Sequence, residues 1–159
     1  MITLNEFIGY LSRDRYVGGL IIGDANNGKT KYVKKFIEVN KDINCLYVDF
    51  IEYVKTNNLQ EKILTITSND FLGICKAIIK NNPMVTFIDN FDFIINLWDQ
   101  RKKKEFVEYV IKLEKSVVAN PVIWIIQTEE IFYDLYKKQS NNQVKHIIQF
   151  GEHKDLAAI

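Results

Sequence analysis

The sequence predicts an α/β domain of three layers, in which a parallel sheet of five strands lies between two layers of helices. Apolar runs of strand length alternate along the chain with stretches of helical periodicity. Several of these runs are apolar almost without interruption, which is typical of strands buried on both faces. Strands that alternate with helices form parallel sheets covered on both faces, because each connection crosses over the sheet. The 159 residues suffice for one such domain with a single core.

The first half of the chain carries four segments with a clear period. Apolar residues at helical spacing mark two of them, and apolar, β-leaning runs mark the other two. In chain order, we expect a helix over residues 5–13, a strand over 17–22, a helix over 31–37 and a strand over 43–50. The second strand is apolar enough to lie at or near the centre of the sheet. The segment that follows it, up to residue 67, shows no clear pattern.

The second half of the chain continues the alternation. Asn69 or Asp70 can cap a helix that runs to Ile79 and that Asn81-Asn82-Pro83 ends. A long helical region with a break near residues 99–101 precedes the Asn120-Pro121 pair, which ends it. The expected elements are strands over 84–89, 122–127 and 144–150, and helices over 91–118 and 129–139.

A phosphate-binding motif lies between the first strand and the helix that follows it. The residues from Gly23 to Thr30 read GDANNGKT and fit G-x-x-x-x-G-K-[ST], the P-loop pattern. The two glycines permit a tight backbone path that turns N–H groups toward one anion, and the helix dipole adds to this field. Lys29 is expected to reach the β- and γ-phosphates, and Thr30 to hold Mg²⁺. The expected nucleotide-binding residues are Gly23, Asp24, Ala25, Asn26, Asn27, Gly28, Lys29, Thr30 and Lys31.

Asp89 is the expected partner of Thr30 in the magnesium site. It closes the third strand, and the carboxyl ends of parallel strands face the crevice where this class of fold binds ligands. Mg²⁺ prefers oxygen ligands and keeps several waters, so one carboxylate and one hydroxyl suit it. The alternative role for Asp89 is that of a helix N-cap, because a helix begins soon after it.

This arrangement resembles the additional-strand class of P-loop ATPases, to which AAA+ and RecA-like proteins belong. The resemblance covers roughly residues 17–150 and depends on the P-loop, on Asp89 and on a further strand that ends in Gln127-Thr128. It implies that this further strand is inserted between the P-loop strand and the Asp89 strand. It also implies that Gln127 or Thr128 contacts the γ-phosphate or the attacking water. The alternative for that pair is a plain polar strand end.

The sequence departs from this class at the residues that decide catalysis. Most members carry a glutamate directly after the Walker B aspartate, and here Asn90 has that place. An amide can orient a water but cannot accept its proton. Asp92 and Glu52 are candidates for the missing role, and the alternative is that both are solvated loop acids. We therefore expect slow hydrolysis.

Arginine is scarce in this chain, with Arg13, Arg15 and Arg101 as its only examples. An arginine finger commonly neutralises the charge that develops on the γ-phosphate, often from a neighbouring subunit. The nine or so residues after the last expected strand are also too few for the helical lid of an AAA+ protein. Any finger is therefore expected from one of these three residues, by self-association, or from another protein.

The net charge of the chain is close to zero, because it has 21 basic and 20 acidic residues. The overall charge therefore gives no reason to expect binding to nucleic acid or to an anionic membrane. The run Arg101-Lys102-Lys103-Lys104 is either a solvated helix start or a local contact to a DNA backbone. No apolar stretch approaches the length of a membrane helix, so we expect a cytoplasmic protein without membrane contact. DNA contact is expected to be indirect, through partners.

The sequence thus predicts an ATP- and Mg²⁺-binding ATPase subunit of a larger assembly. In size and layout the chain is similar to the BrxF family, small P-loop proteins of some bacteriophage-exclusion (BREX) defence systems. That similarity implies a role in phage restriction alongside larger proteins that act on DNA. A small-molecule or nucleotide kinase is one alternative, although such kinases usually have an arginine-rich lid. A catalytically inactive nucleotide-binding scaffold is the other.

Overall fold

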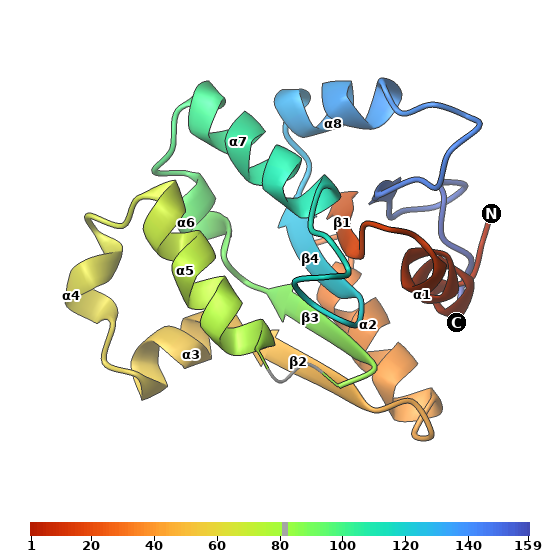
Figure 1. Ribbon diagram of the computed structural model, residues 1–159, viewed down its shortest axis with the longest axis horizontal. Helices are drawn as coiled ribbons and strands as arrows, with labels where there is room; N and C mark the ends of the chain where they lie inside the picture. The colour runs from red at the N-terminus through yellow and green to blue at the C-terminus, as the bar shows by residue number, and fades with distance from the viewer. Residues whose placement is uncertain (81–82) are drawn as a thin grey trace.

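Five parallel strands form one sheet in a computed structural model, which describes residues 1–80 and 83–159. The strand order is β2-β3-β4-β1-β5 (Figure 1). The strands are β1 (Gly18–Gly23), β2 (Cys45–Asp49), β3 (Val85–Asp89), β4 (Val122–Gln127) and β5 (Ile147–Gln149). The predicted fold class is confirmed, and β4 lies between β1 and β3 as expected. Such a sheet is consistent with Rossmann-like and P-loop-like folds.

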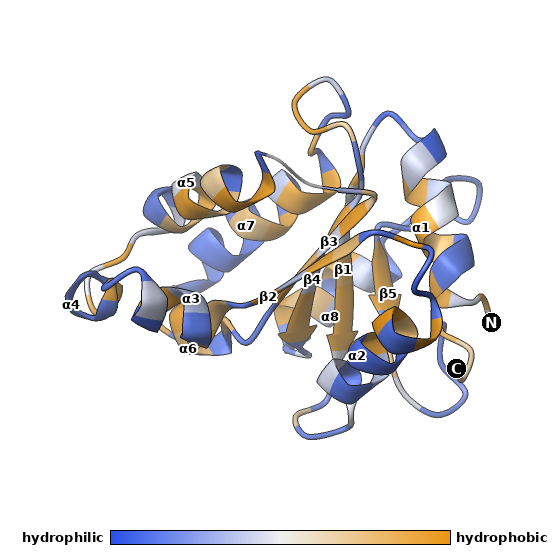
Figure 2. Cartoon of the chain, turned by 90° about the horizontal axis from the view of Figure 1, so that it is seen from below, coloured by the Kyte–Doolittle hydropathy of each residue, from blue (hydrophilic) through white to orange (hydrophobic). Residues whose placement is uncertain are grey.

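Helices alternate with these strands and cover both faces of the sheet. In chain order they are α1 (Leu4–Arg13), α2 (Lys29–Val39), α3 (Phe50–Thr56), α4 (Gln60–Ile63), α5 (Ser68–Ile79), α6 (Asp92–Ile95), α7 (Gln100–Ile111) and α8 (Glu130–Lys137). Figure 2 shows α5 and α7 on one side of the apolar strands and α2 on the other. The core is correspondingly divided into two clusters of buried side chains, one on each face.

The alternation of side chains along each central strand produces these two clusters. In β1, Leu20 and Ile22 join the cluster under α7, whereas Ile21 joins the cluster under α1 and α2. All six residues of β1 and all five of β3 are buried, as their continuous apolarity predicts. The prediction for β2 was wrong: its residues are only partly buried, because β2 forms an edge of the sheet.

The segment without a clear sequence pattern contains α3 and α4. The next helix, α5, is capped by Thr67 and not by Asn69 or Asp70. The Thr67 hydroxyl accepts a hydrogen bond from the Asp70 N–H, and the Asp70 carboxylate accepts one from the Thr67 N–H, both at 3.1 Å. Asp70 therefore closes a capping box. The predicted stop at Asn81-Asn82 lies outside the described residues.

The long helical region is broken where expected but ends earlier. Asp99 caps α7 by accepting a hydrogen bond from the Lys102 N–H at 2.9 Å. The helix ends at Ile111 and not at residue 118, because the residues that follow pair with the chain that enters β1. A Cβ at Gly18 would lie 1.9 Å from the Val110 carbonyl oxygen, so this glycine permits the close packing of α7 on β1.

Candidate functional site

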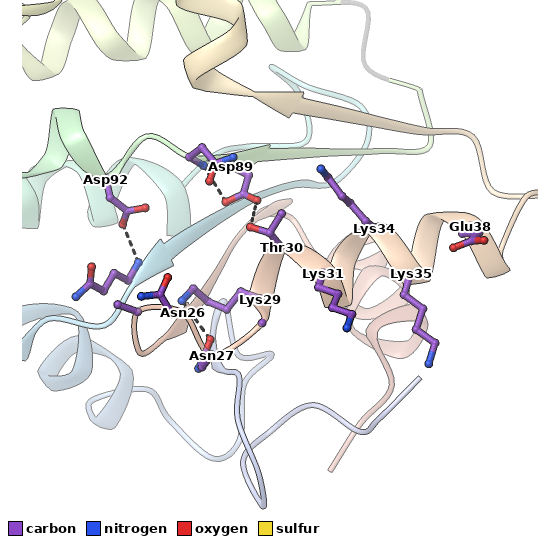
Figure 3. Close-up of a pocket in the computed structure, with 14 residues that line it drawn as sticks. Asn26, Asn27, Lys29, Thr30, Lys31, Lys34, Lys35, Glu38, Asp89 and Asp92 are labelled. Carbon is purple, nitrogen blue, oxygen red and sulfur yellow. Dashed lines mark hydrogen bonds between the residues drawn. The ribbon is translucent and has the colours of Figure 1, made fainter.

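A pocket of about 840 Å³ opens at the edge of the sheet where the strands end. The loop between β1 and α2 forms its floor, α2 extends it to one side, and the ends of β3 and β4 close it (Figure 3). It is lined by Ala25, Asn26, Asn27, Gly28, Lys29, Thr30, Lys31, Lys34, Lys35, Glu38, Asp89, Asn90, Asp92 and Gln127. Most of the residues that the sequence predicts for a nucleotide site thus lie together.

The backbone of the loop depends on its two glycines. Gly28 has a φ of 92°, in the left-handed region, and stands at the N-cap position of α2. A Cβ at Gly23 would lie 2.8 Å from Asn27 Nδ2 and 2.9 Å from Lys29 Cδ. Gly28 has no side chain with which to cap the first N–H groups of α2, so an anion in the pocket can accept them.

The Lys29 ammonium group lies inside this loop. It donates hydrogen bonds to the carbonyl oxygens of Gly23 at 2.8 Å and Asp24 at 2.7 Å, and to Asn27 Oδ1 at 3.3 Å. Burial lowers the pKa of Lys29, and the nearby carboxylates of Asp92, Asp89 and Asp24 partly offset that effect. The cation is thus half-buried among acceptors of the loop, where a phosphate oxygen would be a stronger partner.

Asp89 connects α2 to the neighbouring strands. Its side chain is only 3% exposed, and its Oδ2 accepts hydrogen bonds from Thr30 Oγ1 at 2.5 Å and from the Tyr47 hydroxyl at 2.7 Å. Its Oδ1 accepts a third one, from the Asn90 N–H, at 2.8 Å. Burial, together with the hydrogen bond to Asp89, raises the pKa of Tyr47 above its ordinary value of 10.

The alternative role of Asp89 as a helix N-cap is wrong. The helix that follows, α6, begins at Asp92, with Phe91 at its N-cap position. Asn90 has a φ of 60°, in the left-handed region, and separates Asp89 from this helix. The Asp89 carboxylate is instead hydrogen-bonded to Thr30, on the α2 side of the sheet.

Asp92 and Gln127 meet at the other side of the pocket. Asp92 Oδ1 accepts a hydrogen bond from the Gln127 N–H at 2.8 Å. Burial raises the pKa of Asp92, an effect that this hydrogen bond and Lys29 partly offset. The Thr128 N–H donates to the Gly23 carbonyl at 2.9 Å, so Thr128 joins the end of β4 to the end of β1 without lining the pocket.

Glu52 and the arginines are not brought to this pocket. Glu52 is exposed on α3, and its carboxylate lies 3.5 Å from Lys55 Nζ. Arg15 pairs with Glu114 and Arg101 with Glu105, whereas Arg13 lies over the ring of Tyr10. All three arginines belong to the described part of the chain, and none of them lines the pocket.

The basic run at the start of α7 is not uniformly solvated. Lys103 is 7% exposed and forms a 2.6 Å ion pair with Glu129, at the N-cap position of α8. Arg101 and Lys104 are exposed, and Arg101 faces Glu105 on its own helix. The run is therefore divided between a solvated face and a buried contact of α7 with the segment after β4.

Sequence reasoning missed Tyr47. Its side chain lies on the same face of the sheet as Asp89, because Tyr47 pairs with Phe87, two residues before Asp89. A polar aromatic residue two places before the end of the strand next to Asp89 is the signal that could have found it. The position of Tyr47 is informative only when β2 and β3 are known to be neighbours.

The residues of the pocket fit a magnesium ion held with a nucleotide. The Thr30 hydroxyl and the Asp89 carboxylate lie within hydrogen-bonding distance of each other at the N-terminal end of α2. Both offer the hard oxygen ligands that Mg²⁺ prefers. Within residues 1–80 and 83–159 there is no group of three or more His, Cys, Asp and Glu side chains that could hold a metal by themselves. Mg²⁺ in nucleotide sites uses one or two carboxylates together with the phosphates of the substrate.

The sequence matches no protein-family model, and it matches no curated protein. Among the helices of the described residues, none is long and apolar enough to cross a membrane.

Proposed function

We propose that this chain is a P-loop protein of the additional-strand class that binds ATP together with Mg²⁺. The observation that carries the proposal is the hydrogen bond between Thr30 on the P-loop helix and Asp89 at the end of β3. It joins two residues that are 59 positions apart and that this class uses to hold one metal ion. The order of the strands supports the same class, because β4 separates β1 from β3.

Each group of the pocket has a role in this proposal. The N–H groups at the start of α2 bind the β-phosphate region, and Lys29 exchanges its loop carbonyls for phosphate oxygens. Thr30 and Asp89 would hold Mg²⁺, which would supply positive charge against the phosphates of the nucleotide. Gln127, which lines the pocket and donates its N–H to Asp92, would contact the γ-phosphate with its side chain.

We also propose that hydrolysis is slow and that Asp92 accepts the proton of the attacking water. Asp92 lines the pocket and Glu52 does not, and a raised pKa makes a carboxylate a better base. The water oxygen would bond to the γ-phosphorus, its proton would pass to Asp92, and the bond to the ADP oxygen would break. Asn90 lines the same pocket and can orient the water.

We further propose that the chain works as a subunit of a larger assembly. The pocket has no arginine from the described residues to neutralise the γ-phosphate, so a partner or a second copy would complete it. Phage defence in the manner of BrxF, with DNA contacted by other subunits, is the particular assembly that the size and layout suggest. Co-purification from the native host, followed by mass spectrometry, tests which proteins accompany the chain.

A coupled assay tests the enzymatic proposal. We expect phosphate release from Mg-ATP without an added acceptor, with turnover below the ~1 s⁻¹ typical of slow enzymes. Formation of ADP only in the presence of a phosphoryl acceptor would indicate a kinase. Binding of ATP with neither reaction would indicate a scaffold. A Lys29→Ala variant should be inactive, whereas Lys62→Ala, on α4 and away from the pocket, should match the wild type.

A further inference from the structure

Tyr47 reaches the proposed metal site from a strand that does not itself line the pocket. It lies in the middle of β2, at the edge of the sheet, and its hydroxyl donates to Asp89 Oδ2 at 2.7 Å. The same oxygen accepts the Thr30 hydroxyl. The side chains of the P-loop helix and of the edge strand therefore converge on one carboxylate oxygen.

The three hydrogen bonds to Asp89 fix the plane of its carboxylate. They come from Thr30 on α2, from Tyr47 on β2 and from the Asn90 N–H after β3, and so from three directions. An ionised carboxylate offers about four acceptor sites. With three taken, one remains for a further ligand, and Asp89 lines the pocket. Its 3% exposure leaves little room for water to replace a lost donor.

The ring and the hydroxyl of Tyr47 have separate contacts. The ring packs against the apolar cluster under α2, and Lys34 Nζ lies 5.2 Å from its centroid. The hydroxyl contacts Asp89. A phenylalanine at this position would keep the packing and the contact with Lys34 and would remove only the hydrogen bond.

We infer that Tyr47 is a positioning residue for the proposed magnesium site, because its hydroxyl orients the Asp89 carboxylate toward the cation of the bound nucleotide. The inference rests on the proposed function. Groups that hydrogen-bond to a metal-binding carboxylate orient it, and their loss typically weakens metal binding 10–100-fold. Tyr47 acts through Asp89 and need not touch the nucleotide.

The test compares Tyr47→Phe with a matched control, Tyr136→Phe. Tyr136 also donates its hydroxyl to an aspartate, Asp155, at 3.1 Å, and it does not line the pocket. The measurement is the binding of a fluorescent ATP analogue in EDTA and over a series of Mg²⁺ concentrations. Tyr47→Phe should need about tenfold more Mg²⁺ for the same enhancement of binding, with unchanged binding in EDTA. Tyr136→Phe should match the wild type in both.

Three results would contradict this role, and they differ from one another. A wild-type Mg²⁺ dependence in Tyr47→Phe would overturn the positioning role and leave the proposed function in place. Loss of the binding in EDTA as well would show that the hydroxyl is needed for the fold and not for the metal. If the wild-type chain itself binds no analogue, the proposed function fails, and the inference fails with it.

Discussion

Asp49 and Asp89 end two neighbouring strands and are register partners in the sheet, yet they serve different purposes. The Asp49 carboxylate accepts hydrogen bonds from the N–H groups of Ile51 and Glu52, at 3.0 and 3.3 Å, and caps α3. The Asp89 carboxylate accepts hydrogen bonds from the side-chain hydroxyls of Thr30 on α2 and Tyr47 on β2. Aspartate at one register position of the sheet therefore has a structural role at the end of β2 and belongs to the candidate site at the end of β3.

The backbone after each strand explains this difference. The helix α3 starts at Phe50, so Asp49 is its N-cap by position. After Asp89 the chain passes through the left-handed residue Asn90, and α6 starts only at Asp92. The Asp89 carboxylate is therefore not used by the following helix and remains available to Thr30. Of these two acidic strand ends, the one in the candidate site is thus the one after which the next helix begins late.

The largest expected effect separates the two aspartates by their Mg²⁺ dependence. Asp89→Ala should lose most of the enhancement that Mg²⁺ gives to ATP binding, because it removes a proposed metal ligand, and should keep the binding in EDTA through the P-loop. Asp49→Ala should retain the wild-type dependence. Fluorescence titration with an ATP analogue measures both. Unfolding of Asp89→Ala, or loss of Mg²⁺ dependence in Asp49→Ala, would contradict the assignment.

A second comparison concerns the acidic residues that follow these strands. Asp92→Asn should reduce the rate of ATP hydrolysis about 100-fold, the lower range for loss of a general base, while ATP still binds. Glu52→Gln, on the exposed face of α3, should leave the rate unchanged. Phosphate release under single-turnover conditions measures both variants. Equal losses in the two, or a loss in Glu52→Gln alone, would place the base elsewhere.

A smaller effect is expected on stability at the structural aspartate. Asp49→Ala removes the cap of α3 and should lower the free energy of unfolding by about 1 kcal/mol, whereas Asp49→Asn should leave it nearly unchanged, because asparagine caps a helix about as well as aspartate. Urea unfolding followed by circular dichroism measures the difference. If alanine and asparagine at this position were equally harmless, the cap would contribute nothing to stability.

The smallest expected effect is a pH-dependent gain in stability in Asp92→Asn. Burial raises the pKa of Asp92 above its ordinary 3.8, so the folded protein binds this proton more tightly than the unfolded chain. Stability from this group is therefore present at low pH and is lost as the pH rises through the folded pKa. The neutral amide of the variant would avoid that loss and still accept the Gln127 N–H. The variant should melt higher than the wild type at pH 7, by an amount that shrinks on acidification, and a constant difference would contradict this.

Most of the residues that line the candidate pocket could be predicted, because the loop from Gly23 to Thr30 is one continuous segment and Asp89 closes a strand that the sequence marks clearly. The glycines, Lys29 and Thr30 lie within one turn and one helix start, and their residue types follow from the path of the backbone. The order of the strands came from a resemblance and agrees with the sheet. These features required no knowledge of side-chain packing.

The features that sequence could not supply depend on contacts between distant elements. Tyr47 becomes informative only when β2 is known to lie beside β3. In the sequence, Lys103 belongs to a basic run that a solvated helix start would explain. In the structure it forms an ion pair with Glu129 at the start of α8. The early end of α7 and the edge position of β2 follow from tertiary packing, which overrides apolar periodicity.

The most direct test of the central claim is a thermal unfolding curve with and without Mg-ATP. At a ligand concentration a hundredfold above Kd, linkage adds about 2.7 kcal/mol, which for a domain of this size raises the melting temperature by roughly 5 to 10 °C. Lys29→Ala should abolish this shift, and Lys62→Ala should keep it. A wild-type melting curve that millimolar Mg-ATP leaves unchanged would contradict the account.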